Sequence, residues 1–390
     1  MIPLSYNLRS IVVRRTTSAA AVIGIALVVF VLASTLMLSA GIRDTLSRNG
    51  GVDSVVVIRK GSDNELSSII DQNKVGTILS APGVARSDGD IPIGTGEIAM
   101  IVQLAPTGNP LGLTNVQMRG VDPTVLQKIR PRFRIVEGRM MAPGTDEAIV
   151  GRAIEGQFEH LAVGDTIEPK KNLPLKVVGT FEDGGSSLES ELWADIDTTR
   201  AAFGRQGIVS SVRARLDDPS SFAAFEMTVE SDKNLGLEAM TETEWSDKQS
   251  QFLSIFVTAL GVIISFFFAI GAIIGAMITM YASIANRQQE IGTLRAIGFR
   301  RRHVLLSFIL ESVLLALTGG VLGCLAALGM SFVKFSILNF VTFSQMVFKF
   351  HATPSVFGVA LVFTVGMGVL GGLLPAMRAA RMSPVEAMRN

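Results

Sequence analysis

The sequence predicts an α-helical membrane protein with four transmembrane helices and one large mixed α+β domain outside the membrane. Of its 390 residues, 48% are hydrophobic and only 18% are charged, which is too apolar for an ordinary soluble protein. The apolar residues gather in four runs, and a membrane span needs about 20 of them. Between the first two runs, residues 43–250 alternate short β-branched stretches with Gly, Pro and Asp. That alternation is typical of a folded domain with strands and turns.

The first span is predicted at residues 18–42, after a short basic segment at residues 1–17. Residues 18–40 carry no charge, and this run is longer than the apolar core of a cleaved signal, which has about 7–15 residues. We therefore expect it to stay as an anchor, with the N-terminus in the cytoplasm. Residues 4–15 alternate apolar and basic side chains, which fits a short interfacial helix or, equally, charge that only sets orientation.

Residues 43–250 are expected to fold as one water-soluble unit. Period-two and β-branched stretches predict strands, and helical periodicity predicts amphipathic helices. The expected strands are 54–59, 97–104, 116–121, 148–151, 175–181 and 208–216, and the expected helices are 66–79 and 220–230. A glycine-rich β segment at about 132–195 interrupts the alternation of strand and helix. We interpret it as a β-rich subdomain inserted into another unit.

The second apolar run has no charge from residue 252 to residue 284. As a helix it would measure about 50 Å, whereas the hydrocarbon core of a bilayer is about 30 Å thick. Residues 251–284 are therefore expected to form a span and a stalk that leads to the soluble domain. The later segments are a third span at 304–334, a short outer connection at 335–354, a fourth span at 355–377 and a cytoplasmic tail at 378–390.

The distribution of basic residues predicts the orientation of these spans. Arginines are enriched in the segments 1–17, 285–303 and 378–390, whereas residues 334–351, at and after the outer end of the third span, carry only Lys334 and Lys349. Because Lys and Arg favour cytoplasmic loops, both termini are predicted inside the cell and the large domain outside.

Glu311 is an ionisable residue within the third predicted span. A charge at membrane depth is a candidate functional site. Alternatively, Glu311 pairs with the triplet Arg300–Arg302 at the mouth of the span and serves structure. The sequence leaves both interpretations open.

The polar segment 285–303 separates the second and third spans, so it must lie at a face of the membrane. Ile291, Leu294 and Ile297 recur every three residues and predict one apolar docking face on a short surface helix. Gly298 is placed where a helix commonly ends.

The order of residues in this segment resembles the cytoplasmic coupling element of MacB/FtsX-type ABC transporter permeases. A generic basic loop would explain the arginines but not the order Glu-Ile-Gly-x-Leu-Arg. In that family the element docks on the nucleotide-binding subunit, so the resemblance implies an ATPase-coupling role. The residues assigned to this role are Arg287, Gln288, Glu290, Ile291, Gly292, Leu294, Arg295 and Gly298, with Ala296 completing the pattern.

Other parts of the chain resemble the same family. Val136–Arg139, Val163–Thr166 and Leu175–Phe181 are similar to phrases of its extracytoplasmic region, although each would also suit ordinary hairpins. The family's C-terminal ending is matched by Pro375, Ala379, Pro384, Ala387 and Arg389. The resemblance covers essentially the entire chain, and it implies a MacB-like periplasmic core domain with two porter-like βαβ halves and an inserted β-rich subdomain.

The sequence lacks the motifs of several catalytic classes. It contains no Gly-x4-Gly-Lys-Ser/Thr phosphate loop, no His-Glu-x-x-His pair and no nucleophile elbow. Gly366, Gly368 and Gly371 fit Gly-x-Gly-x-x-Gly, but they lie in the fourth span, where helix packing explains them. Cys324 is the single cysteine, and a net charge of +1 gives no case for nucleic acid. We expect no catalysis, metal or cofactor in this chain, with ATP and Mg²⁺ on a partner ATPase.

The resemblance implies a non-catalytic permease subunit in the inner membrane. Such a subunit couples ATP hydrolysis on another chain to motion of a periplasmic domain, by mechanotransmission, for export or efflux of a substrate. The implied partners are an ABC ATPase subunit, a second permease copy, and a periplasmic adaptor with an outer-membrane channel. Two alternatives share the layout: a lipoprotein-releasing permease, and an FtsX-like signal transmitter that activates an external cell-wall hydrolase. The sequence does not identify the substrate.

Overall fold

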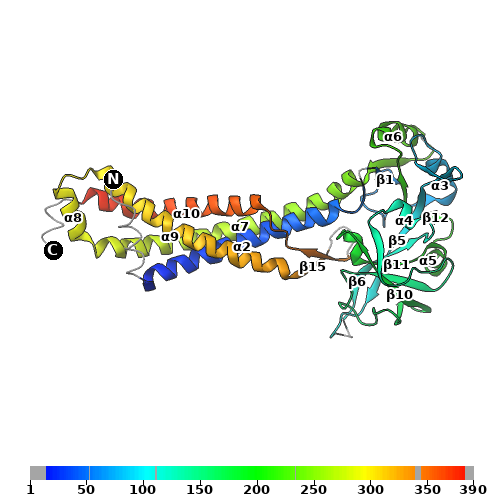
Figure 1. Ribbon diagram of the computed structural model, residues 1–390, viewed down its shortest axis with the longest axis horizontal. Coiled ribbons are helices and arrows are strands. Elements are labelled where there is room, and N and C mark those ends of the chain that lie inside the picture. Colours follow the sequence, from blue (N-terminus) through cyan, green and yellow to red (C-terminus); the bar gives the residue numbers. More distant parts are fainter. Residues whose placement is uncertain (1–14, 52, 110–111, 233, 339–343, 383–390) are drawn as a thin grey trace. The chain divides into compact units, whose positions relative to one another are not determined.

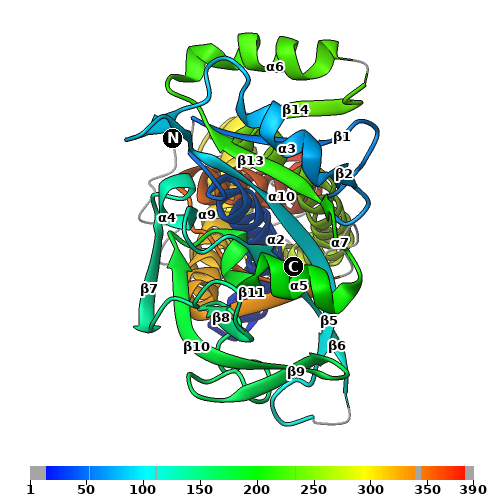
Figure 2. The ribbon, with the colours of Figure 1, turned by 90° about the vertical axis from the view of Figure 1, so that its right-hand side faces the viewer.

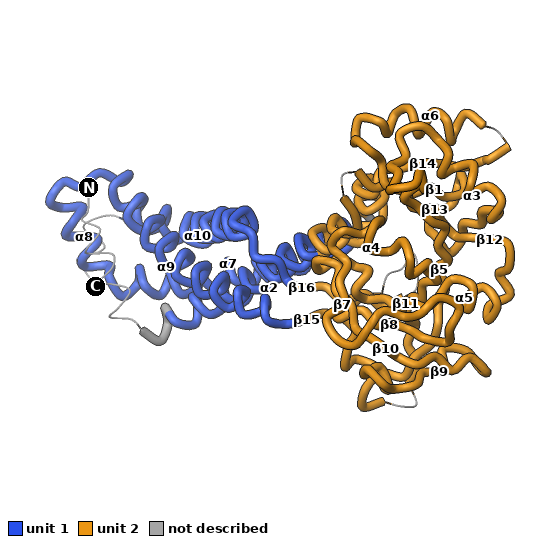
Figure 3. Tube along the Cα trace, turned by 45° about the vertical axis from the view of Figure 1, so that its right-hand side comes forward, with its two compact units in different colours: residues 1–41, 255–333, 350–390 blue, residues 42–254, 334–349 orange. Residues whose placement is uncertain are grey.

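The computed structural model describes residues 15–51, 53–109, 112–232, 234–338 and 344–382 (Figure 1). The predicted interfacial segment at 1–17 is described only from Arg15, where a helix begins. The last three positions of the C-terminal pattern, Pro384, Ala387 and Arg389, lie outside the described residues. The chain divides into two compact units (Figure 3). The first contains residues 1–41, 255–333 and 350–390, and the second contains residues 42–254 and 334–349.

Among the described residues, four helices are long and apolar enough to cross a membrane, which confirms the predicted class. They are α2 (Arg15–Ser47), α7 (Glu242–Ala285), α9 (Arg301–Gly329) and α10 (Pro354–Arg381). The short helix α8 (Gln288–Ala296) lies between α7 and α9 in sequence, and the 3₁₀ turn η3 (Met330–Phe332) follows α9. The uncharged run predicted as span and stalk is part of α7, which continues without interruption for 44 residues.

Glycines let three of these helices approach one another closely. A Cβ on Gly319 of α9 would lie 2.7 Å from the Val22 carbonyl oxygen of α2, and one on Gly368 of α10 would lie 2.8 Å from Ala316 of α9. By contrast, Gly271 and Gly275 of α7 have no such neighbour within 4 Å, and they line an apolar groove of about 530 Å³ with residues of α2. Small residues thus serve packing within the chain at α9 and α10.

The second unit is built on a sheet in the order β14-β1-β13-β5-β6-β11-β8-β10-β7, with β9 paired to β10. In the first part of this sheet each strand is antiparallel to its neighbour. Helix α3 (Gln72–Leu79) precedes β5, and α6 (Phe222–Ser231) joins β13 to β14. The strands are β1 (Ser54–Arg59), β5 (Gly94–Leu104), β13 (Ser211–Arg215) and β14 (Leu237–Thr241).

These elements form two interleaved split β-α-β units, because the parallel strands of each unit have a strand of the other unit between them. Both helices cover one face of the sheet: Ile78 of α3 and Phe225 of α6 belong to one buried cluster with Val55 and Val57 of β1. In Figure 2, α3 and α6 lie beside β1, β13 and β14 in the upper part of the view. This arrangement agrees with the predicted βαβ halves.

The inserted part lies between β5 and β13. Strand β5 is shared, since Gly94–Glu97 pairs with β13 and Ile98–Leu104 pairs with β6. Strand β6 was expected before the insertion, but it pairs with β5 and, in parallel, with β11. The elements are β6 (Thr114–Val121), α4 (Leu126–Ile129), β7 (Phe133–Gly138), β8 (Glu147–Gly151), β9 (Thr166–Lys170), β10 (Leu173–Asp183), η1 (Ser187–Ser190), β11 (Glu191–Asp195) and α5 (Ile196–Phe203).

Two predicted elements of the second unit are shorter than expected. The helix predicted at 66–79 begins only at Gln72, because Ile70 and Asp71 form a strand pair with Ile208 and Val209. For the same reason the strand predicted at 208–216 is divided into two strands. The short strands and turn of this unit are β2 (Ile70–Asp71), β3 (Arg86–Ser87), β4 (Ile91–Pro92), β12 (Ile208–Val209) and η2 (Pro219–Ser221).

The connection between α9 and α10 contains a hairpin that was not predicted. Its strands are β15 (Lys334–Leu338) and β16 (Gln345–Lys349), and both belong to the second unit. Val347 is buried in the core of the inserted sheet, and its backbone N–H donates to Ser190 Oγ at 3.1 Å.

Candidate coupling site

The predicted coupling segment folds as a short helix with a defined end. Helix α8 ends at Ala296, and Gly298 follows with φ +104°. The Phe299 N–H donates to the Leu294 carbonyl oxygen at 3.2 Å, and the Gly298 N–H donates to the Arg295 carbonyl oxygen at 3.2 Å. These two bonds form a Schellman motif, which needs a residue that tolerates positive φ. Gly298 therefore ends the helix as the sequence predicts.

The predicted apolar stripe does not lie on one face. Ile291 is 2% exposed and packs with Met280 of α7 and Phe308 of α9, whereas Ile297 is 72% exposed. An α-helix turns once every 3.6 residues, so positions three apart drift by about 60° at each step. Ile291 therefore anchors α8 to the bundle, and Ile297 points away from that contact.

Arg287 ties the start of α8 to the third span. Its Nη1 lies 3.2 Å from Glu311 Oε2, and its Nε lies 3.4 Å from Glu290 Oε2. The side chains of Arg287 and Glu311 are 10% and 5% exposed. Of the two interpretations of Glu311, the structure favours structural pairing, but with Arg287 rather than with the triplet Arg300–Arg302. The residues of that triplet are exposed.

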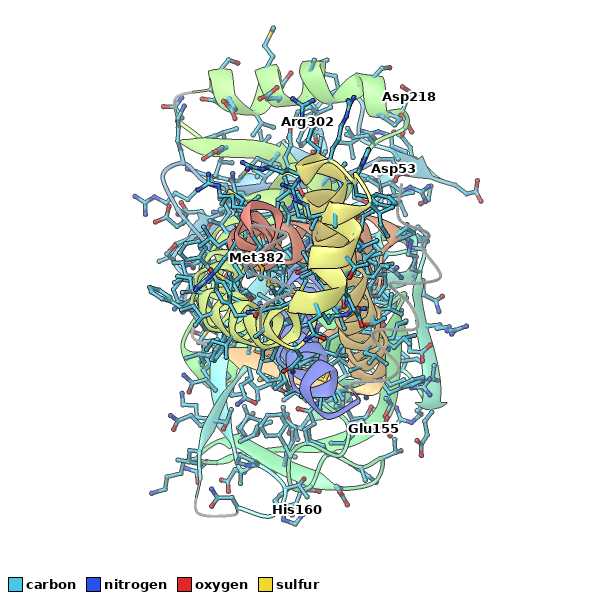
Figure 4. All side chains as sticks on the ribbon, turned by 90° about the vertical axis from the view of Figure 1, so that its left-hand side faces the viewer. Asp53, Glu155, His160, Asp218, Arg302 and Met382 are labelled. Atoms are coloured by element: carbon cyan, nitrogen blue, oxygen red, sulfur yellow. The ribbon has the colours of Figure 1, made fainter. Side chains whose placement is uncertain are left out.

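The remaining predicted site residues divide between the two faces of α8. Gly292 is buried, and Gln288, Leu294 and Arg295 are partly buried, while Glu290 is exposed. The exposed face also includes Gln289 and Thr293, which were not predicted. Ala296 of the motif and Ile297 of the predicted apolar face are exposed there too. Figure 4 views the chain from the side of α8, with Arg302 and Met382 labelled.

Arginines dominate the polar residues near α8. Arg378 of α10 lies 5.9 Å above the ring of Tyr281. Arg295 is partly buried, and its Nε has no hydrogen-bond partner among the described residues. Together with the exposed triplet, these side chains give the region a basic character, which would suit an acidic partner surface.

A second polar feature lies in the second unit, and the sequence analysis missed it. Seven charged residues, each no more than 6% exposed, contact one another there through their side chains. We call them the buried charge cluster, and they are Glu65, Glu97, Arg119, Arg130, Glu191, Arg213 and Glu242. In β6, Arg119 shares a face with Gln117 and Val121, opposite the core residues Val116 and Met118. Period-two alternation therefore assigns Arg119 to the polar face, so the sequence carries no signal that it is buried.

Arg119 occupies the centre of this cluster. Its Nε and Nη2 donate to both carboxylate oxygens of Glu191, at 2.7 and 2.8 Å, and it also contacts Glu65 and Glu97. Burial alone would raise the pKa of Glu97, but Arg130, Arg213 and Arg119 lower it to about 2. The same balance, with Arg119 and Arg213, holds the pKa of Glu65 far below its usual value. These carboxylates are therefore ionised and fully paired at neutral pH.

The described residues contain no group of three His, Cys, Asp or Glu side chains that could hold a metal ion. Cys324 is buried in α9.

Two family models match the chain over both of its units. One, described as the MacB-like periplasmic core domain, matches residues 16–231, and the other, described as the FtsX-like permease C-terminal region, matches residues 262–384. The chain belongs to the MacB/FtsX-type ABC transporter permeases. The resemblance stated from the coupling motif is thereby confirmed.

Relatives of this permease include proteins named macrolide export ATP-binding/permease protein MacB. The one from Acinetobacter baylyi is 28% identical over 229 residues, which cover 56% of this chain and 33% of that protein. The one from Shewanella sp. is 25% identical over 373 residues, 86% of this chain and 56% of that protein. The chain therefore spans about a third to a half of these relatives. The solved periplasmic region of MacB from Actinobacillus actinomycetemcomitans is 14% identical, with a TM-score of 0.38, and covers 53% of this chain and 94% of that one.

Proposed function

We propose that this permease couples ATP hydrolysis on a separate nucleotide-binding subunit to motion of its extracytoplasmic domain, and that this motion drives export of a substrate. The observation that carries the proposal is the build of α8. It is anchored by Ile291 and by the Arg287–Glu311 pair, while Glu290 and Ile297 remain exposed. A helix that is packed on one face and exposed on the other can transmit a displacement from a bound partner to α7 and α9.

Helix α7 supports the mechanical part of the proposal. It continues from Glu242 to Ala285, directly before the coupling segment, and it contains no proline. An α-helix without a break transmits displacement along its axis because every turn is hydrogen-bonded to the next. We therefore assign α7 the role of a lever, in an assembly with two permease copies.

ATP and Mg²⁺ are assigned to the partner because the 390 residues contain no phosphate-binding loop. The basic residues around α8 favour the cytoplasmic side of the inner membrane for this helix and for both termini. Orientation is tested with single cysteines in a Cys324→Ala background: a membrane-impermeant thiol reagent added outside should label Glu155→Cys and leave Asn286→Cys unlabelled. Labelling of position 286 from outside would reverse the assigned topology.

Efflux is preferred to the two alternatives because the MacB relatives are named as export proteins. Lipoprotein release and FtsX-like activation of a cell-wall hydrolase remain the competing proposals. A periplasmic adaptor and an outer-membrane channel are proposed partners of the efflux assembly. Co-purification of an adaptor would support efflux, whereas co-purification of a cell-wall hydrolase would support signalling.

The coupling role is tested by ATPase stimulation in lipid vesicles that contain the permease and its ATPase subunit. We expect Glu290→Ala with Arg295→Ala to reduce stimulation by at least about tenfold, equivalent to about 1.4 kcal/mol. The matched control removes two charges from the hairpin of the second unit, Lys334→Ala with Lys349→Ala, and should leave stimulation unchanged. ATP hydrolysis by the purified chain alone, or equal stimulation in both variants, would contradict the assignment.

A further inference from the structure

Three segments that lead to the candidate spans meet within the second unit. Asn49, just after α2, accepts hydrogen bonds at Oδ1 from the Ser187 N–H at 3.0 Å and from Ser187 Oγ at 2.8 Å. Glu242, the first residue of α7, pairs with Arg213. The hairpin between α9 and α10 reaches the same turn, η1, through the bond from Val347 to Ser190.

The buried charge cluster connects these three attachments. Arg213 contacts Glu242 and also Glu65, at 3.0 Å, and Glu97, at 3.1 Å. Those two glutamates contact Arg119, which holds Glu191, the residue directly after η1. An unbroken series of ion pairs therefore runs from the start of α7 through β13 and β6 to β11. It crosses from the split β-α-β part of the sheet into the inserted part.

Close packing surrounds this meeting point. A cavity of only about 20 Å³ remains there, which is room for about one water molecule. Asn49, Trp245 of α7 and Met346 of β16 line it together with Arg119 and Arg213. Gly50 lies directly against Glu242, and a Cβ at this position would clash with the Glu242 side chain. The end of α2 and the start of α7 are thus held against the same ion pairs.

Stability alone does not explain such a cluster. Burying charges costs desolvation free energy, and well-packed apolar residues in their place are often neutral or stabilising. What the ion pairs add is a fixed orientation, because the N–H groups of a guanidinium donate to carboxylate oxygens only in its plane and at fixed angles. Arg119 uses this fork on Glu191 through two parallel bonds.

We propose that the buried charge cluster is a rigid joint, which makes the split β-α-β part and the inserted part move with α7 as one body. The proposal rests on the proposed function, because the lever supplies the motion that the joint passes on. Without the joint, displacement of α7 would be lost as bending between the two parts of the sheet.

The test measures two distances by spin labels in the full chain with its ATPase subunit in lipid, in a Cys324→Ala background. The first distance joins Met227→Cys on α6, which is 72% exposed, to Glu155→Cys in the inserted part, which is exposed. Doubly labelled chains are diluted with unlabelled chains so that this distance is measured within one chain. The second distance joins Glu155→Cys residues of two copies. Each is recorded without nucleotide and with a non-hydrolysable ATP analogue.

In the unmodified chain we expect the distance between copies to change with nucleotide, while the distance within the chain stays narrow and constant. The double variant Arg213→Met with Glu242→Met removes both partners of the ion pair that joins α7 to the cluster. In it we expect the distance within the chain to broaden and to shift with nucleotide, and the change between copies to be lost. The buried Trp193 and Trp245 report by fluorescence whether the second unit is folded. If the double variant does not fold, Glu242→Gln, which keeps the side-chain shape, should give the same broadening.

The matched control is Arg139→Met with Glu147→Met, an arginine–glutamate pair of the inserted part outside the cluster. It should leave both distances as in the unmodified chain. A folded cluster variant with a narrow distance within the chain and a full response between copies would overturn the joint. If the distance between unmodified copies did not change with nucleotide, the proposed function itself would be overturned. Failure of the joint and failure of the proposed function therefore give different results.

Discussion

The coupling segment and the buried charge cluster both use arginine–glutamate contacts away from water, but they satisfy those charges differently. Arg287 and Glu311 make one pair, 3.2 Å apart, beside an exposed helix face. In the cluster, Arg119 contacts three glutamates, and no member is more than 6% exposed. One pair can hold a short helix against its neighbour. A network in which Arg119 and Arg213 each contact three glutamates fixes the mutual orientation of several strands, because rotating either arginine would break several contacts at once.

The largest expected effect comes from breaking the network at its centre. Arg119→Met leaves Glu65, Glu97 and Glu191 buried with too few cations. We expect the free energy of unfolding of the second unit to fall by about 3–5 kcal/mol, measured by denaturant with Trp193 and Trp245 fluorescence.

The matched control is Arg134→Met, which removes an exposed partner of Glu182. The side chain of Arg134 is 72% exposed, so its loss should cost less than about 1 kcal/mol. Equal losses in the two variants would show that the cluster is no different from a surface ion pair.

A smaller effect is expected at the coupling segment. Arg287→Met leaves one buried carboxylate, Glu311, and should weaken the local structure by about 1.5–3 kcal/mol. Hydrogen exchange of the α8 amides should then be about 10- to 100-fold faster. The double variant Arg287→Met with Glu311→Met should recover most of the protection, because neither charge is left alone. No recovery would mean that the pair is not what holds α8.

The smallest effect concerns Asp183, which lies near the cluster but is not part of it. Burial raises its pKa to about 6, although Ser186 donates a hydrogen bond to it at 2.7 Å. The folded state thus binds this proton more tightly than the unfolded state does, whose pKa is about 3.9. The stability that results is complete below about pH 4 and is lost as the pH rises through 6.

At pH 4 the free energy of unfolding of the second unit should be similar in Asp183→Asn and in the unmodified chain. At pH 7 it should be higher in the variant by about 1–3 kcal/mol, because the unmodified chain has lost the stability that the bound proton supplied. The measurement is the free energy of unfolding between pH 4 and pH 8, with the exposed Asp146→Asn as control. A constant difference between variant and unmodified chain over this range would contradict the raised pKa. Glu97, with a pKa of about 2, stays ionised in the folded state over this range. Its own contribution has the opposite sign, is confined to the lowest pH values, and cancels in the difference between variant and unmodified chain.

Composition and short motifs predicted much of this molecule. The four spans follow from apolar length, the strand Ser54–Arg59 was predicted with the bounds it has, and Gly298 ends α8 as its position suggests. These features depend on local sequence. The start of α3 at Gln72 was missed because Ile70 and Asp71 pair with a strand far along the chain.

The partners of charged residues were harder to predict for the same reason. Pairing with Arg300–Arg302 was one of the two interpretations of Glu311 that the sequence left open, yet Glu311 contacts Arg287. In the cluster, Glu65 and Glu242 come from opposite ends of the second unit. Each looks like an ordinary surface glutamate in sequence, and only the sheet order brings both to Arg213. Burial of a charge is a property of tertiary pairing, which periodicity does not report.

The sheet order also determines when this domain can be completed during synthesis. Strand β1 is made early, but both of its neighbours, β13 and β14, come after the whole inserted part. Chains are synthesised at about 5–20 residues per second, so both edges of β1 remain unpaired for on the order of ten seconds or more. The hairpin β15–β16, which also belongs to this unit, follows only after α7 and α9. The growing chain therefore presents unpaired, apolar strand edges for a long interval, which is a state prone to aggregation.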